Sequence, residues 1–227
     1  MPVVLFESDD LLVIDKPAGL IVHSDGRTEE PSVAEWILAK YPALAEVGEP
    51  WISPQGGKIL LPGIVHRLDR TTSGVMLIAK TNEMYRHLKE EFKARRIHKT
   101  YLAWVYGHPS TSSGQVIAEI VRTKETPKRW AAQPTTVGDK RAAITIWRVL
   151  KRTKDEATGE PVSLLEIKPQ TGRTHQIRVH LASIGHPIIS DHLYAPDKPQ
   201  LLNCHRPALH AASIALSIRG QQKVFNT

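Results

Sequence analysis

The sequence predicts one α+β domain built around a large sheet. The chain has 227 residues, which is enough for one good core and short for a two-domain protein. Several short segments rich in branched and apolar residues are typical of strands, and three others carry apolar residues at helical spacing. Hydrophobic residues make up 41% and charged residues 23% of the chain, which fits a folded globular protein and excludes disordered and collagen-like classes.

The first third of the chain predicts a hairpin, a helix and a loop. Two apolar runs, residues 3–6 and 11–14, flank a polar turn and indicate a β-hairpin. A capping box at residues 32–35 opens a short amphipathic helix that Pro42 ends. Residues 42–63 contain four prolines and four glycines with weak periodicity, so a long surface loop is expected there.

The middle of the chain predicts a buried strand, a helix and then most of the sheet. Residues 75–79 are wholly apolar, and residues 82–96 repeat apolar side chains every fourth position before a basic tail. A polar hairpin turn is expected within residues 148–160. Further strands are expected over residues 98–107, 115–121, 142–150 and 162–167.

A third helix is expected between Thr174, a suitable N-cap, and Gly185, a suitable stop. At about 100° per residue, Arg178 falls within about 60° of His175, so both can face one cleft. The backbone N–H groups that open this helix, together with Arg173, form a ready phosphate site. The predicted buried stripe consists of Ile177, Leu181 and Ile184.

Charge and cysteine content indicate a basic intracellular protein. Lysine and arginine total 30 against 23 acidic residues, a net charge of +7 that predicts attraction to polyanions such as nucleic acid. Cys204 is the single cysteine, so no internal disulfide can form and a reducing compartment fits. The N-terminus lacks a basic leader and no apolar run reaches 18 residues, so we expect a cytoplasmic protein without a membrane span.

Residues 62–74 concentrate polar side chains between two apolar runs, with Asp69 near their centre. Arg67 and Arg70 stand within two residues of it, and nearby cations favour an ionised carboxylate. Such a group suits a nucleophile or a charge stabiliser. A two-carboxylate acid–base pair has no local support, because no second acid lies within ten residues. The alternative is a surface Arg-Asp-Arg salt-bridge cluster.

Residues 66–74 read His-Arg-Leu-Asp-Arg-Thr-Thr-Ser-Gly, which resembles the signature of the RluA-type pseudouridine synthases. In that family the aspartate is catalytic and the arginine two residues before it fills the space of a base flipped out of the RNA. The resemblance therefore assigns these roles to Asp69 and Arg67. Residues 10–23 also resemble the start of the family's catalytic domain, and the sequence leaves no room for its optional S4 module.

Three later segments extend the resemblance. Residues 99–107 resemble the second motif, whose tyrosine, here Tyr101, stacks beneath the target base; taken alone, Tyr101 is more typical of a core tyrosine. Residues 171–180 match the third motif, whose arginine pairs with the catalytic aspartate, so Arg178 would hold Asp69. Ser190 stands before Asp191 where relatives usually have glycine. Residues 209–216 resemble the closing motif and its strand.

The resemblance implies a mixed, largely antiparallel sheet flanked by helices and loops, with a central active cleft. The implied reaction converts uridines in structured ribosomal or transfer RNA to pseudouridine. The base flips out, its glycosidic bond breaks and uracil reattaches through C5. Whether Asp69 attacks C1′ or acts as a base stays open. The alternative is a catalytically silent RNA-binding protein on the same fold.

The expected site residues follow from these motifs and from a basic run at residues 122–130, which can bind RNA, although exposed charge runs are usually only solvated. The catalytic set is Asp69, Tyr101 and Arg178. The expected RNA and uridine contacts are His66, Arg67, Leu68, Thr72, Ser73, Gly74, Arg173, Thr174, His175, Gln176, Ile177, Lys128 and Arg129.

No cofactor and no metal are expected. The chain has eleven histidines, yet their spacing fits no known ligand pattern. The sequence also lacks a Gly-x-Ser-x-Gly elbow and the glycine-rich loops that hold nucleotides. The expected partner is an RNA stem-loop of ribosomal or transfer RNA. No membrane or protein partner is indicated, so a monomer is expected.

Overall fold

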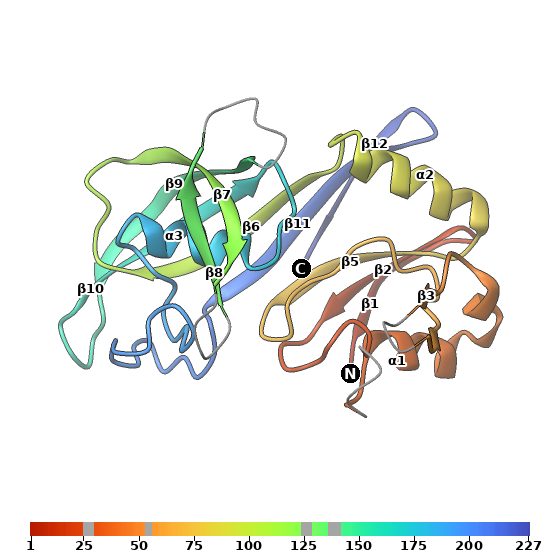
Figure 1. Ribbon diagram of the computed structural model, residues 1–227, viewed down its shortest axis with the longest axis horizontal. Coiled ribbons are helices and arrows are strands. Elements are labelled where there is room, and N and C mark those ends of the chain that lie inside the picture. Colours follow the sequence, from red (N-terminus) through yellow and green to blue (C-terminus); the bar gives the residue numbers. More distant parts are fainter. Residues whose placement is uncertain (25–29, 53–55, 124–128, 136–141) are drawn as a thin grey trace. The chain divides into compact units, whose positions relative to one another are not determined.

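The computed structural model of the protein describes residues 1–24, 30–52, 56–123, 129–135 and 142–227 (Figure 1). These form two compact units, one of Met1–His98 with Ala211–Thr227 and one of Lys99–His210. Strands that pair almost wholly antiparallel and three α-helices in the described part confirm the predicted α+β class. None of the described helices is long and apolar enough to cross a membrane.

The first unit is organised by two buried strands. β1 (Val3–Glu7) pairs antiparallel with β2 (Leu11–Lys16), which confirms the predicted hairpin, and β2 pairs antiparallel with β5 (Ser73–Ala79). Every residue of β5 is buried, as the apolar run at residues 75–79 predicted, but the strand begins two residues earlier, at Ser73. β11 (Leu209–Ile218), which starts in the second unit, forms a hairpin with β12 (Gln221–Asn226).

Two helices of this unit begin at well-formed caps. α1 (Val33–Lys40) opens with the predicted capping box, in which the Ser32 hydroxyl and the Glu35 carboxylate each accept the other residue's N–H. α2 (Asn82–Lys93) begins at Thr81 and buries Met84 and Leu88. It ends earlier than predicted, because Arg95 adopts a left-handed backbone with φ 58°.

The predicted loop of residues 42–63 contains more order than its composition suggested. A short 3₁₀ helix, η1 (Pro42–Glu46), follows α1 directly. β3 (Trp51–Ile52) and β4 (Lys58–Ile59) then pair as a small antiparallel ribbon. The prolines and glycines therefore separate short elements instead of leaving a structureless loop.

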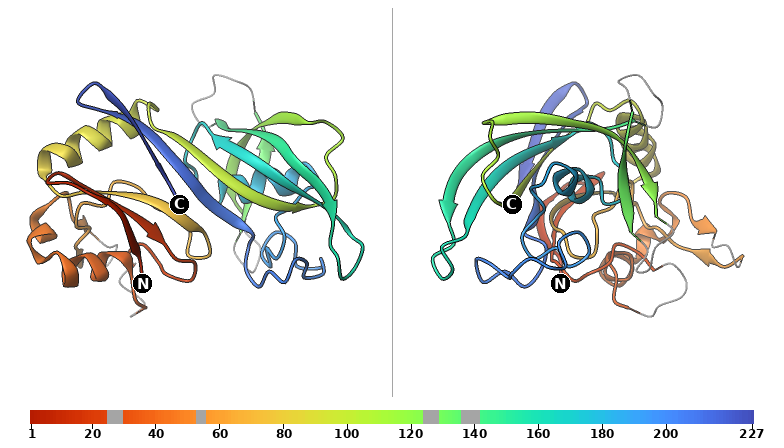
Figure 2. Two further views of the ribbon diagram at one scale, coloured as in Figure 1. Left: turned by 180° about the vertical axis from the view of Figure 1, so that it is seen from behind. Right: turned by 60° about the vertical axis from the view of Figure 1, so that its left-hand side comes forward.

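The second unit is a curved antiparallel sheet with α3 (Gln176–Ser183) against its concave side (Figure 2). Its core joins Ile177 and Leu181 of α3 to apolar residues of the strands, such as Leu165. The strand order is β6 (His98–Tyr106), β10 (Pro161–Pro169), β9 (Ala142–Lys154), β7 (Ser113–Arg122) and β8 (Trp130–Pro134).

The predicted strands of the second unit are confirmed; β6 ends one residue earlier than predicted, and β7, β9 and β10 have wider bounds. β9 runs on to Lys154, so the polar turn expected within residues 148–160 is confined to residues 155–160. β8 was not predicted, because it follows the basic run. The sequence also did not predict β12, whose side chains are almost all exposed.

Two details of the predicted third helix are wrong. The N-cap is His175, with φ 53° and no capping side chain, instead of Thr174. Ile184 is 37% exposed because the helix has ended, although Ile177 and Leu181 are buried as predicted. The stop at Gly185 is confirmed by its left-handed φ of 81°.

Candidate active site

Asp69 lies half-buried in the loop that leads into β5 of the first unit. The Thr72 N–H donates to the Asp69 carbonyl oxygen at 3.0 Å and closes a turn. Leu68 and Thr72, on either side, are 5% and 2% exposed, whereas Arg67 is an exposed residue. Because both flanks are buried and β5 is rigid, the backbone fixes the place of Asp69.

The completely buried side chain of Lys16, at the end of β2, anchors this loop. Its ammonium donates to the carbonyls of Pro17 at 2.9 Å, Leu20 at 2.8 Å and Arg70 at 3.3 Å. A buried ammonium must pair its three N–H groups, and these carbonyls do so. One of them belongs to the residue after Asp69. Lys16 thereby ties residues 17–20 to the loop.

Arg70, one of the two cations expected beside Asp69, is engaged elsewhere. Its guanidinium lies 3.0 Å from the Glu30 carboxylate and donates to the Gly19 carbonyl at 3.3 Å. The Arg70 side chain is 57% exposed, so this pair is a surface salt bridge of small energetic value. The Arg-Asp-Arg cluster considered as an alternative therefore loses one of its cations to Glu30.

His66 holds the same loop against β5. Its Nε2 atom lies 2.9 Å from the backbone nitrogen of Leu77, and a backbone N–H can only donate, so Nε2 carries no proton. The ring also packs 4.8 Å from Phe92 of α2. His66 thus has a defined role within the fold, and its expected contact with RNA stays a prediction.

The second unit contributes Tyr101 from β6, which is half-buried and packs against the core cluster that includes Ile177. Both readings of this tyrosine, core residue and base platform, are compatible with that placement. Lys99, two residues earlier, lies near Gly172, since a side chain at Gly172 would meet its Nζ at 3.7 Å. Burial lowers the pKa of the Lys99 ammonium.

Gln176 organises the start of α3. Its side-chain oxygen accepts from the Thr171 hydroxyl at 2.7 Å and from the Arg173 N–H at 3.0 Å. Its amide nitrogen donates to the Ile144 carbonyl at 2.9 Å and to the Thr145 hydroxyl at 3.0 Å. The residue is 4% exposed, so Gln176 serves the turn internally, and the Arg173 N–H expected to bind phosphate is already occupied.

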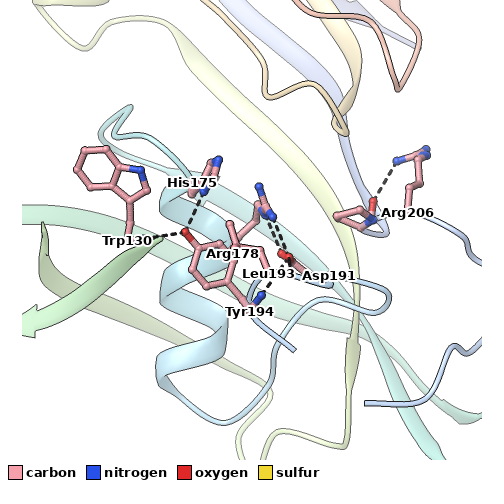
Figure 3. Close-up of polar contacts among 8 residues, drawn as sticks. Trp130, His175, Arg178, Asp191, Leu193, Tyr194 and Arg206 are labelled. Atoms are coloured by element: carbon pink, nitrogen blue, oxygen red, sulfur yellow. Dashed lines mark hydrogen bonds and ion pairs between the residues drawn. The ribbon is translucent and has the colours of Figure 1, made fainter. Parts of the chain in front are cut away.

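Figure 3 shows the polar cluster around Arg178 of α3. Its guanidinium donates twice to Asp191, at 2.7 and 2.8 Å, and lies 5.0 Å from the ring centre of Tyr194. The Tyr194 hydroxyl bonds to His175 Nδ1 at 2.8 Å and accepts from the backbone N–H of Trp130 at 3.2 Å. The left-handed backbone of His175 therefore occurs where its side chain is held.

The burial of His180 predicts that the stability of the protein depends on pH. It is fully buried, its Nδ1 bonds to the Thr145 hydroxyl at 2.9 Å, and its Nε2 has no hydrogen-bond partner within the described part of the chain. Burial lowers the pKa of the imidazole to about 4. Between that value and an unfolded pKa of about 6.5, the unfolded chain binds the extra proton, so stability falls as pH falls.

Urea unfolding of the wild type and of His180→Asn at pH 7 and pH 5 tests this. We expect the wild type to lose about 2 kcal/mol more than the variant over that interval, because the variant cannot take up the proton. Equal losses would show that His180 is protonated as readily in the folded state as in the unfolded chain.

The remaining expected residues divide between the units. Thr72, Ser73 and Gly74 are buried in the first unit, and Arg129 is half-buried in the second, whereas Lys128 lies outside the described residues. Asp69 belongs to the first unit and Arg178 to the second, so their pairing stays a prediction. No group of three His, Cys, Asp or Glu side chains that could hold a metal ion occurs among the described residues.

Comparison with known proteins gives a consistent result. Residues 10–183 match the family model described as RNA pseudouridylate synthase. An uncharacterised RNA pseudouridine synthase of Synechocystis sp. is 36% identical over 213 residues, covering 94% of this chain and 60% of that protein. The ribosomal large subunit pseudouridine synthase D of Zymomonas mobilis is 35% identical over 231 residues, covering 98% of this chain and 68% of that protein.

Among solved structures, human RNA pseudouridylate synthase domain containing 1 matches with a TM-score of 0.75 and 25% identity, covering 100% of this chain and 83% of the human one. Several curated relatives are considerably longer, since the chain spans only 55 to 60% of their length. The family match includes the loop of Asp69, the strand of Tyr101 and the helix of Arg178. The chain therefore belongs to the RNA pseudouridylate synthase family.

Proposed function

We propose that this chain converts uridines within structured RNA to pseudouridine. The observation that carries the proposal is the family match over residues 10–183, which contains a complete signature around Asp69. The anchoring of that loop by Lys16 and His66 supports it, because a catalytic carboxylate needs a fixed backbone. We further propose that residues 1–227 act as one catalytic domain.

In the proposed reaction, the N1–C1′ bond of a uridine breaks, uracil turns, and a C5–C1′ bond forms. C5 loses its proton and N1 gains one, so the product is an isomer. Extruding the base costs a few kcal/mol, least in loops. The exposed Arg67 fills the vacated space, and phosphate contacts offset the remaining cost.

Three side chains carry the proposed chemistry. Asp69 either attacks C1′ or removes a proton from the ribose, and both routes need the ionised carboxylate. Tyr101 lies beneath the uracil, and Arg178 pairs with Asp69 to keep it charged and oriented. The other residues expected to contact RNA are proposed to surround the extruded nucleotide or to support those that do.

The proposed substrate is a stem-loop of ribosomal or transfer RNA. The Zymomonas relative is named for the large ribosomal subunit, which favours ribosomal RNA. A net charge of +7 supports binding to any of these polyanions and predicts that affinity falls with salt. We propose that the protein works as a monomer, without cofactor, in the cytoplasm.

Tritium release from RNA labelled at C5 of uridine tests the proposal, because only C5–C1′ bond formation requires loss of that hydrogen. RNA should come from cells that lack the gene, so that the target uridines are unmodified. We expect time-dependent release by the purified chain. The alternative, a catalytically silent RNA-binding protein, predicts RNA binding with release no higher than in the enzyme-free control.

A further inference from the structure

Arg178 and Asp191 form a buried ion pair in the second unit. The exposed fractions of their side chains are 8% and 0%. The Arg178 Nε donates to one carboxylate oxygen at 2.7 Å and Nη2 to the other at 2.8 Å. This is a two-point contact, which fixes direction as well as distance.

The carboxylate of Asp191 is itself held. The oxygen that accepts from Arg178 Nη2 also lies 3.2 Å from the Leu193 nitrogen and 3.3 Å from the Tyr194 nitrogen, both of which donate to it. Ser190, just before it, has a left-handed φ of 59°, and its N–H donates to the Tyr106 hydroxyl at 3.1 Å. The backbone on both sides of Asp191 is therefore constrained to present the carboxylate to α3.

Tyr194 restricts the guanidinium from a second direction (Figure 3). Its ring centre lies 5.0 Å from the guanidinium carbon, close enough for a cation–π contact. Its hydroxyl is tied to His175 at 2.8 Å and to the Trp130 N–H at 3.2 Å. The ring is thus fixed to the start of α3 and to β8. Arg178 is held along one edge by Asp191 and across one face by Tyr194.

This much constraint exceeds what stability requires. A buried ion pair pays a large desolvation cost, and apolar side chains of similar volume often stabilise a protein equally well. A guanidinium has five N–H donors in one plane, so engaging the edge of Nε and Nη2 determines where the opposite edge points. The arrangement is suited to fixing the direction in which the guanidinium of Arg178 presents its other edge.

We propose that Asp191 and Tyr194 are positioning residues for the reaction, which fix the Arg178 guanidinium in the orientation that it needs to engage the catalytic carboxylate. The inference rests on the proposed function, in which Arg178 holds Asp69. Neither residue was among the site residues expected from the sequence. Both act through Arg178 and not on the RNA.

The kinetic test compares Asp191→Asn, Arg178→Lys and the double variant in the tritium-release assay. Loss of the two-point contact should lower kcat about 100-fold, as expected for a misplaced catalytic partner, with KM unchanged within about twofold. The double variant should be no slower than Arg178→Lys alone, because a lysine ammonium has no planar second edge for Asp191 to orient. Multiplied losses, or an unchanged kcat in Asp191→Asn, would overturn the proposal.

Asp155→Asn is the matched control for fold damage. Asp155 is a buried carboxylate of the same unit that accepts from the Leu202 N–H at 2.7 Å and from the Thr158 N–H at 3.0 Å. Its loss should lower Tm and leave kcat unchanged in protein assayed well below Tm. Equal kcat losses in both variants at equal Tm would assign Asp191 a merely structural role.

A second measurement separates this proposal from the proposed function. The Arg178 Nε–H proton should exchange slowly in NMR spectra of the wild type and rapidly in Asp191→Asn, whether or not the protein modifies RNA. Should Asp191→Asn fail to fold, Tyr194→Leu leaves the Asp191 carboxylate in place, removes the ring contact and the hydroxyl bonds to His175 and Trp130, and should lower kcat about 10-fold. Slow exchange in Asp191→Asn, or full activity of Tyr194→Leu, would refute the positioning role.

Discussion

Asp69→Asn should reduce pseudouridine formation by on the order of 10⁴-fold or more, while RNA binding stays within about twofold of wild type. Asparagine keeps the shape of the side chain but removes the charge that either proposed route requires. The loop should keep its conformation, because Leu68, Thr72, His66 and Lys16 anchor it. Tritium release measures the reaction, and fluorescence anisotropy with a labelled stem-loop measures binding.

Asp10→Asn provides the matched control for that experiment. Asp10 is a half-buried aspartate of the same unit, paired with Arg219 at 2.8 Å, so the variant makes the same chemical change away from the loop. It should release tritium at the wild-type rate. Wild-type turnover by Asp69→Asn would remove this carboxylate from the mechanism, and a parallel loss of RNA binding would point to a damaged loop.

The sequence correctly predicted those elements whose conformation is determined by residues close together in the chain. The capping box of Ser32 and Glu35 and the apolar run of residues 75–79 each appear in the structure as expected. The capping box is a pair of hydrogen bonds between residues three positions apart, and the strand is an uninterrupted apolar run that is buried along its whole length. Such signals survive in any surrounding fold.

Errors occurred where distant contacts decide the local conformation. Thr174 has the chemistry of an N-cap, yet Gln176 takes the Arg173 N–H and bridges to Thr145, which places the cap at His175. β8 lies at one end of the second unit's strand order beside β7, and its side chains are half-buried or exposed, so its sequence lacks a burial pattern. Propensity is a weak guide when the deciding partner lies tens of residues away.

The motifs pointed to the candidate site, but not to its supports. In the sequence alone, Lys16, Asp191 and Tyr194 look like ordinary charged or aromatic residues. The structure distinguishes Lys16 and Asp191 by their complete burial, and the half-buried Tyr194 by its contacts with Arg178 and His175. Asp191 is completely buried, and a buried carboxylate requires a paired cation and donors. Ser190 has a left-handed backbone, a conformation that glycine adopts more readily than serine, which fits the glycine that the family motif implies for this position.

Gly74→Ala should destabilise the protein by about 3 kcal/mol or more. Gly74 lies at the start of β5 with φ 122°, a backbone conformation that residues with a side chain rarely adopt. A methyl group there would come within 2.2 Å of the Ala211 carbonyl oxygen, which is backbone and cannot rotate away. Urea unfolding followed by circular dichroism measures the loss.

Gly159→Ala separates backbone strain from steric clash. Gly159 also has a left-handed φ, of 76°, but an added methyl group would meet nothing within 4 Å. This variant should therefore cost only about 1 kcal/mol, the strain of the conformation itself. A Gly74→Ala cost no larger than that of Gly159→Ala would mean that β5 and Ala211 are not packed closely. A larger cost would show that close packing against Ala211 explains the glycine at the end of the Asp69 signature.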